Sequence, residues 1–137
     1  MDRERLPGRR RTRQLEVVLE AVRDSGVEHP SADRVFERVR CVLPRISLGT
    51  VYRNLQRLAA EGQIGAVDVA GRSTRYDPTP HEHDHFICRI CGRLDDVPVT
   101  RPAAGLRAAS RAGHLVTSHA LLLRGVCRDC RRSATSP

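Results

Sequence analysis

The chain has 137 residues, enough for one domain of ordinary size or two very small ones. The formal net charge is +8, and every basic side chain counted is arginine, a balance that suits a polyanionic partner such as nucleic acid. No apolar run is long enough for a membrane span or a secretory signal, so we expect a cytoplasmic protein with no membrane contact.

The first 13 residues form a basic arm, and three predicted helices follow it. Arginines of the arm such as Arg10 would touch DNA phosphates, unless the arm is an ordinary solvated terminus. Helical periodicity with Ser or Thr at the N-caps predicts helices over 12–26, 31–44 and 47–62. Their inward-facing residues are Leu15, Val18, Leu19, Val22, Val35, Phe36, Val39, Val42, Leu43, Leu48, Val51, Leu55 and Leu58.

The second and third helices are joined by a short turn, 44–46, which is helix-turn-helix spacing. The outward face of the third helix carries Thr50, Arg53, Gln56 and Arg57, which suits a helix that reads the major groove. A solvated helix face is the alternative. Strands over 64–69 and 74–77 would complete a winged helix, with Arg72 and Arg75 positioned to touch the DNA backbone.

A proline-rich linker divides the chain. We expect a winged-helix domain over 1–77, a hinge over 78–82 and a metal-binding dimerisation domain over 83–137. In the second half we predict sheet over 93–99, a helix over 102–112 and a strand over 117–123 with a buried leucine run. The residues after Cys130 read as a polar tail. The predicted fold class is therefore α+β.

Two C-x-x-C pairs are the strongest chemical signal in the sequence. Cys88, Cys91, Cys127 and Cys130 supply four thiolates, which close a tetrahedral structural zinc site. Disulfides and an iron–sulfur cluster are the alternatives, but the first would be labile in a reducing compartment and the second usually follows other spacings. The fifth cysteine, Cys41, is interpreted as a bystander.

A histidine run precedes the first C-x-x-C pair. His81, His83 and His85 share one face of an extended segment, where imidazoles are good ligands for Fe(II), Mn(II), Ni(II) or Zn(II). The carboxylates available nearby are Asp77 and either Asp95 or Asp96. A solvated polar strand is the alternative. An oxygenase centre is the enzymatic reading, but the few aromatic residues would line a substrate pocket poorly, so we expect no enzyme.

In combination, five segments resemble the ferric uptake regulator family: 29–33 (HPSAD), 46–55 (ISLGTVYRNL), 75–77 (RYD), 83–92 (HDHFICRICG) and 125–130 (GVCRDC). The resemblance implies a homodimeric, metal-dependent repressor that binds a double-stranded DNA operator. It implies that Tyr52 and Arg53 approach bases. It also implies a regulatory Fe(II) or Mn(II) site made by His29, Asp77, His83, His85 and Asp96.

The branch of the family is indicated by the two aspartates. Asp at positions 77 and 96 is similar to the peroxide-responsive branch, in which hydrogen peroxide oxidises a histidine ligand of bound iron and the repressor leaves DNA. An iron- or manganese-responsive repressor of metal-uptake genes is the alternative. Two positions depart from the family pattern: Leu15 replaces an arginine, and Ala103 replaces a glutamate of a second sensory site, which leaves Glu82, Asp84 and His119 as a weak set.

Overall fold

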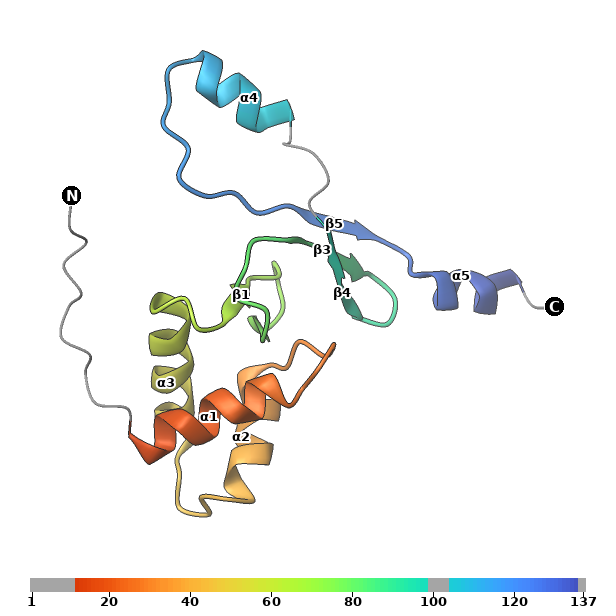
Figure 1. Ribbon diagram of the computed structural model, residues 1–137. Coiled ribbons are helices and arrows are strands. Elements are labelled where there is room, and N and C mark those ends of the chain that lie inside the picture. The colour runs from red at the N-terminus through yellow and green to blue at the C-terminus, as the bar shows by residue number, and fades with distance from the viewer. Residues whose placement is uncertain (1–11, 99–103, 136–137) are drawn as a thin grey trace. The chain divides into compact units, whose positions relative to one another are not determined.

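The computed structural model describes residues 12–98 and 104–135 and divides the chain into two compact units between Pro80 and His81 (Figure 1). The basic arm with Arg10 and the position of Ala103 lie outside the described residues. Among the residues described, no helix combines the length and the apolar character needed to cross a bilayer.

Three capped helices open the N-terminal unit: α1 (Arg13–Arg23), α2 (Ala32–Arg40) and α3 (Leu48–Ala60). The predicted caps are confirmed, because each side-chain oxygen accepts a backbone N–H three residues further on. The cap distances are 3.2 Å for Thr12 to Leu15, 3.4 Å for Ser31 to Arg34 and 3.1 Å for Ser47 to Thr50. Each cap satisfies a donor that the first helical turn cannot pair internally.

The apolar faces of the three helices meet in one core, as predicted, except that Leu48 is only half-buried and does not belong to the core. Its fully buried side chains include Leu15, Val35, Val51 and Leu55. Val42 was predicted to join them, and this is wrong: α2 ends at Arg40 and Val42 is 54% exposed. The N–H groups of Val42 and Leu43 both bond to the Val39 carbonyl, so the chain tightens into a turn that leaves Val42 outside.

A short hairpin completes a winged helix. Strands β1 (Gly65–Val67) and β2 (Arg75–Asp77) pair antiparallel, with Gly65 opposite Asp77, and are shorter than the predicted strands. Tyr76 in β2 is buried against the helical core, which anchors the hairpin to the helices.

The C-terminal unit is a three-stranded sheet with two helices (Figure 1). Its strands are β3 (Asp84–Cys88), β4 (Leu94–Val97) and β5 (Leu122–Gly125), in the order β4-β3-β5. Strand β4 pairs antiparallel with β3, and β5 pairs parallel with it. The helices are α4 (Ala104–Arg111) and α5 (Arg128–Thr135).

Three expectations for this unit need correction. The last strand begins at Leu122, not at residue 117. The leucine run is not buried as predicted, since Leu121 and Leu123, which share one side of the chain, are 42% and 43% exposed. The polar tail is helix α5, which starts inside the second C-x-x-C pair. The histidine run enters the sheet only at Asp84, so His81 and His83 precede the strand.

Candidate metal centres and DNA-binding face

The four predicted zinc cysteines converge in the C-terminal unit. The sulfur atoms of Cys88, Cys91, Cys127 and Cys130 all lie within 4.8 Å of one another, and the thiols are not joined by disulfides. Cys91 Sγ and Cys127 Sγ are 3.8 Å apart. A tetrahedral ion with Zn–S bonds of about 2.3 Å would give sulfur–sulfur edges of about 3.8 Å, so the cluster has the size that zinc requires.

Local backbone bonds explain why the first pair forms a compact knuckle. Cys88 ends β3, its N–H donates to the Arg93 carbonyl at 2.9 Å, and its carbonyl accepts the Gly92 N–H at 2.9 Å. Gly92 turns the chain at φ 73°, a conformation that favours glycine. The parallel pairing of Cys88 with Gly125 then delivers the second pair, which follows directly along the chain.

The environment of the thiols favours the thiolate at Cys88 and the protonated thiol at Cys130. The Cys127 N–H donates to Cys88 Sγ at 3.3 Å, and together with the N–H of Cys91 it lowers the pKa of the Cys88 thiol to about 6. Hydrogen bonding to Cys127 raises the pKa of the Cys130 thiol to about 12, which keeps its proton in place until a cation displaces it. Four thiolates without an open position are the donor set of a structural zinc ion.

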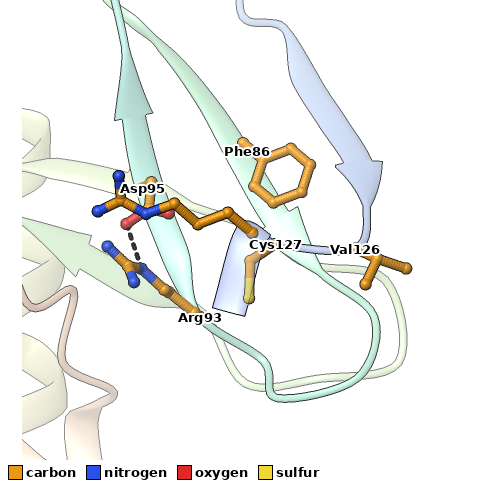
Figure 2. A pocket seen from close by; sticks show the side chains of 6 residues that line it. Phe86, Arg93, Asp95, Val126 and Cys127 are labelled. Atoms are coloured by element: carbon orange, nitrogen blue, oxygen red, sulfur yellow. Dashed lines mark hydrogen bonds and ion pairs between the residues drawn. The ribbon is translucent and has the colours of Figure 1, made fainter. Parts of the chain in front are cut away.

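Arg93 links the turns that carry the two C-x-x-C pairs, which we call the two knuckles: residues 88–91 and residues 127–130. Its Nε donates to Asp95 Oδ1 at 2.7 Å, and its Nη1 donates to Asp129 Oδ2 at 3.0 Å, inside the second C-x-x-C pair. Figure 2 shows this guanidinium beside Asp95, at a hollow that Phe86 and Cys127 also line. Strand β4 is therefore joined to the zinc knuckle by a side chain as well as by the sheet.

A histidine and a carboxylate form a buried pair in the N-terminal unit. His29 Nε2 lies 3.3 Å from Asp77 Oδ2, and the two side chains are 2% and 1% exposed. The Thr79 N–H holds the other oxygen, Asp77 Oδ1, at 2.8 Å, which turns Oδ2 toward the imidazole. Gly65 makes room for this carboxylate, because a Cβ there would lie 3.2 Å from Asp77 Cβ.

A second nitrogen–oxygen cluster lies in the C-terminal unit. Asp96 Oδ1 is 3.0 Å from His83 Nε2 and 3.4 Å from His85 Nε2. His83 Nδ1 is 2.7 Å from the His81 carbonyl, the kind of contact that orients a metal-binding imidazole. The sheet register pairs His85 with Asp96 and Phe86 with Asp95, so Asp96 is the carboxylate beside the histidines.

The outward face of α3 carries the predicted DNA-binding residues. Tyr52, Arg53 and Gln56 are exposed. Arg53 Nη2 donates to Thr50 Oγ1 at 3.1 Å, and Thr50 Oγ1 lies 2.9 Å from the Ser47 hydroxyl that caps the helix. Arg57 Nε lies 2.8 Å from Glu61 Oε1, so part of its guanidinium already forms an ion pair with an acidic side chain.

Three contacts were not foreseen from the sequence. Arg93 joins Asp129 across 36 positions, and Arg75 Nε donates to the His29 carbonyl across 46 positions rather than facing outward. Neither spacing has a sequence signature. The Ser47–Thr50–Arg53 chain follows the i, i+3 spacing of a helix and was readable in principle. Of the weak second set, His119 Nδ1 lies 3.9 Å from Glu82 Oε2.

A winged helix joined to a four-cysteine sheet domain defines a class, the two-domain metal-binding transcription regulators. Within that class, the model of the ferric uptake regulator family matches residues 7–123. The chain belongs to the ferric uptake regulator family, which confirms the resemblance of its motifs.

Known relatives agree with this assignment. The chain is 32% identical over 127 residues to the peroxide operon regulator of Bacillus subtilis, covering 91% of this chain and 86% of that protein. The solved structure of the Campylobacter jejuni peroxide stress regulator is similar with a TM-score of 0.70 and 29% identity, over 85% of this chain and 88% of that one. The Helicobacter pylori ferric uptake regulator, described as having three functional metal binding sites, is similar with a TM-score of 0.72 and 25% identity, over 89% and 82%.

Proposed function

We propose that this protein is a metal-dependent repressor that binds a double-stranded DNA operator as a homodimer and responds to hydrogen peroxide. The observation that carries the proposal is that each unit holds a cluster of imidazole and carboxylate side chains, which we call a half-site. The N-terminal half-site contains His29 and Asp77, and the C-terminal one contains His83 and Asp96. The four cysteines form a separate site. In this proposal residues 1–77 read DNA, 78–82 act as the hinge, and 83–137 hold metal and form the dimer.

The regulatory metal would join the two half-sites. His29 and Asp77 would come from the first unit, and His83, His85 and Asp96 from the second. Imidazole nitrogens with carboxylate oxygens suit Fe(II) and Mn(II) better than the thiolate cluster does. An ion held by both units would favour one interdomain angle, and so one spacing between the reading helices of a dimer, with coupling of about 1–3 kcal/mol.

The DNA contacts would come from α3 and from the arm. Arg53 is the residue best placed to read a guanine edge, since Thr50 already orients its guanidinium. Tyr52 and Gln56 would contact neighbouring bases, Arg57 would do so after leaving Glu61, and Arg10 would bind phosphate.

The homodimer would form through the C-terminal unit. Leu121 and Leu123 leave apolar surface beside the open edge of β5, and no residue of α4 is buried in the single chain. A second copy would cover these side chains and pair or shield the edge.

Bound Fe(II) would activate peroxide close to the ligand side chains, and the two electrons that reduce the peroxide would come overall from the oxidised ring. The net change is the insertion of one peroxide oxygen into a ring C–H bond of His29 or His83, with the second oxygen leaving as water. An oxidised ring is a poorer ligand, so the units would lose their fixed relation and the DNA would be released. Each event consumes the sensor, which makes the protein a switch and not an enzyme.

The test begins with a DNA duplex that the Mn(II)-loaded protein selects from a random-sequence pool. Binding to this duplex is then measured with Fe(II) or Mn(II), before and after a short peroxide pulse, and the peptides are analysed by mass spectrometry. We expect both metals to support binding. Only the Fe(II) form should release DNA and gain one oxygen on the peptide with His29 or His83.

Asp96→Glu is the matched control, because it keeps the charge and lengthens the carboxylate arm. It should retain metal-dependent DNA binding and respond less to peroxide. DNA release with oxidised cysteines and intact histidines would contradict the proposed mechanism. Metal-dependent binding that ignores peroxide would favour the iron- or manganese-responsive alternative.

A further inference from the structure

Arg75 lies on β2 two residues before Asp77, and its side chain reaches the loop that carries His29. Its Nε donates to the His29 carbonyl oxygen. Backbone contacts also join the strand to this loop. The Tyr76 N–H donates to the Pro30 carbonyl at 2.9 Å, and Ser31 forms an antiparallel bridge with Arg75. Strand β2 therefore holds three consecutive residues of the loop.

The same strand also holds the imidazole. Residues at i and i+2 of a strand project from one face, so Arg75 and Asp77 both face the loop. Asp77 lies 3.3 Å from His29 Nε2 while Arg75 binds the backbone of the same residue. His29 is thus fixed at its carbonyl and at its ring by two side chains of one short strand.

The positive charge of Arg75 is only partly compensated at this half-buried position. Burial lowers the pKa of Arg75, and neighbouring Arg72 lowers it further, while Glu28 raises it. Glu28 also accepts from Arg38 Nη2 at 2.8 Å. Arg38 in turn donates to the Ser25 hydroxyl and to the Ala21 carbonyl, the latter at 3.5 Å, so α2 supports the preceding turn.

This arrangement differs from that of a phosphate contact. The guanidinium of Arg75 is half-buried, and its Nε is already engaged by a backbone carbonyl. Arg72, by contrast, is exposed in the turn between β1 and β2. The two wing arginines, which the sequence places in one role, therefore have different surroundings.

We propose that Arg75 is a positioning residue for the regulatory metal. It fixes the backbone of His29 so that Nε2 faces Asp77, and it ties this ligand to the DNA-binding hairpin. The inference rests on the proposed function, because it assigns a partner to that same site. Loss of an outer partner of a metal ligand typically weakens metal binding by about 10–100-fold.

The test compares the full-length variants Arg75→Gln, Arg72→Gln and His29→Ala with the wild type. Mn(II) affinity is measured by electron paramagnetic resonance, and binding to the selected duplex is measured against salt at saturating Mn(II). We expect Arg75→Gln to weaken Mn(II) binding by about 10-fold or more with an unchanged salt slope. Arg72→Gln should keep Mn(II) affinity and reduce the salt slope by about 1.

Hydrogen exchange gives a readout that does not depend on metal. The Tyr76 amide, which is bonded to the Pro30 carbonyl, should exchange faster in metal-free Arg75→Gln than in the metal-free wild type. Arg75→Lys keeps a donor and should lie between the two. These measurements also reveal whether the winged helix is still folded, because the amides of α3 should remain protected in both variants.

The outcomes separate two failures. Wild-type Mn(II) affinity in His29→Ala would overturn the metal site itself. Reduced affinity in His29→Ala with wild-type affinity in Arg75→Gln would overturn only the role of Arg75. An Arg75→Gln protein that binds Mn(II) normally and has a reduced salt slope would assign this arginine to DNA phosphate.

Discussion

Removal of zinc should unfold the C-terminal unit and leave the N-terminal unit folded. Among the described residues of the C-terminal unit, the buried apolar side chains are Ile87, Cys88, Leu94 and Cys127, and two of these belong to the four-cysteine cluster that could hold zinc. Burial of Ile87 and Leu94 contributes about 3–6 kcal/mol in total. A structural zinc site contributes about 10–16 kcal/mol, so the ion stabilises this unit more than its apolar core does.

The N-terminal unit has a different balance. Its core includes twelve buried aliphatic or alanine side chains together with Tyr76, and none of them depends on zinc. Because ordering a residue costs about 1–2 kcal/mol of backbone entropy, the two aliphatic side chains of the C-terminal unit offset only a few residues. The same reasoning makes the N-terminal unit independent of the cluster.

Amide hydrogen exchange during titration with a strong zinc chelator measures both units in one sample. The His85 N–H, which bonds to the Leu121 carbonyl at 3.0 Å, should lose protection as zinc leaves. The Val51 N–H, which bonds to the Ser47 carbonyl at 3.2 Å, should keep it. Cys127→Ser should reproduce the effect, whereas Cys41→Ser, at an exposed thiol outside the cluster, should have none.

The reasoning would be refuted by a zinc-free protein whose β3 amides remain protected. It would also be refuted if protection at His85 and Val51 were lost together, since the two units would then fold as one.

Three further predictions concern single contacts. Ser47→Ala removes the cap of α3 and should cost about 1 kcal/mol, lowering the melting temperature of the N-terminal unit by about 4–8 °C in calorimetry. Leu123→Asp places a charge on the proposed dimer surface and should yield monomers in sedimentation, whereas Val27→Asp, at an exposed site of the other unit, should not. Arg93→Gln releases Asp129 and should speed zinc transfer to a chelator by up to about fivefold, with Arg89→Gln as an unaffected control in the same knuckle.

Features with local causes could be predicted from the sequence. The three helices followed from side-chain periodicity and from caps that act over three residues, as at Ser31 and Ser47. The zinc cluster followed from cysteine spacing. Helix α5 could not be predicted in this way, since none of its residues is buried and it has no apolar stripe to detect.

Features that depend on register could not be predicted. Residue spacing alone left Asp95 and Asp96 open, and Asp96 was chosen only through the family resemblance; a physical choice needs the pairing of β4 with β3, because a shift of one residue exchanges the two faces of a strand. The exposure of Leu123, 43%, depends on which elements pack against its face of the sheet. The contact between Arg75 and the His29 carbonyl depends on how the hairpin packs against a loop 46 positions away.

The zinc site and the regulatory site would have different functions. Each half of the regulatory site is built on a strand whose position is fixed without the regulatory ion. Strand β2 holds His29 through Arg75 and Asp77, and it is anchored by buried Tyr76. Strand β3 carries His85 and ends at Cys88, so a zinc ion bound by the four cysteines would fix its C-terminal end. Because the ligands of both half-sites are already ordered, little of the free energy of binding the regulatory ion is needed to position them.

The free energy of binding the regulatory ion would then act mainly on the relation between the units, and in the proposed function through that relation on operator affinity. Loss of the regulatory ion should leave both folded units intact and change only their relation. Loss of zinc should instead destroy the half-site on β3 together with the fold that supports it. In the proposed function, oxidation of one histidine would therefore be enough to release DNA without unfolding the protein.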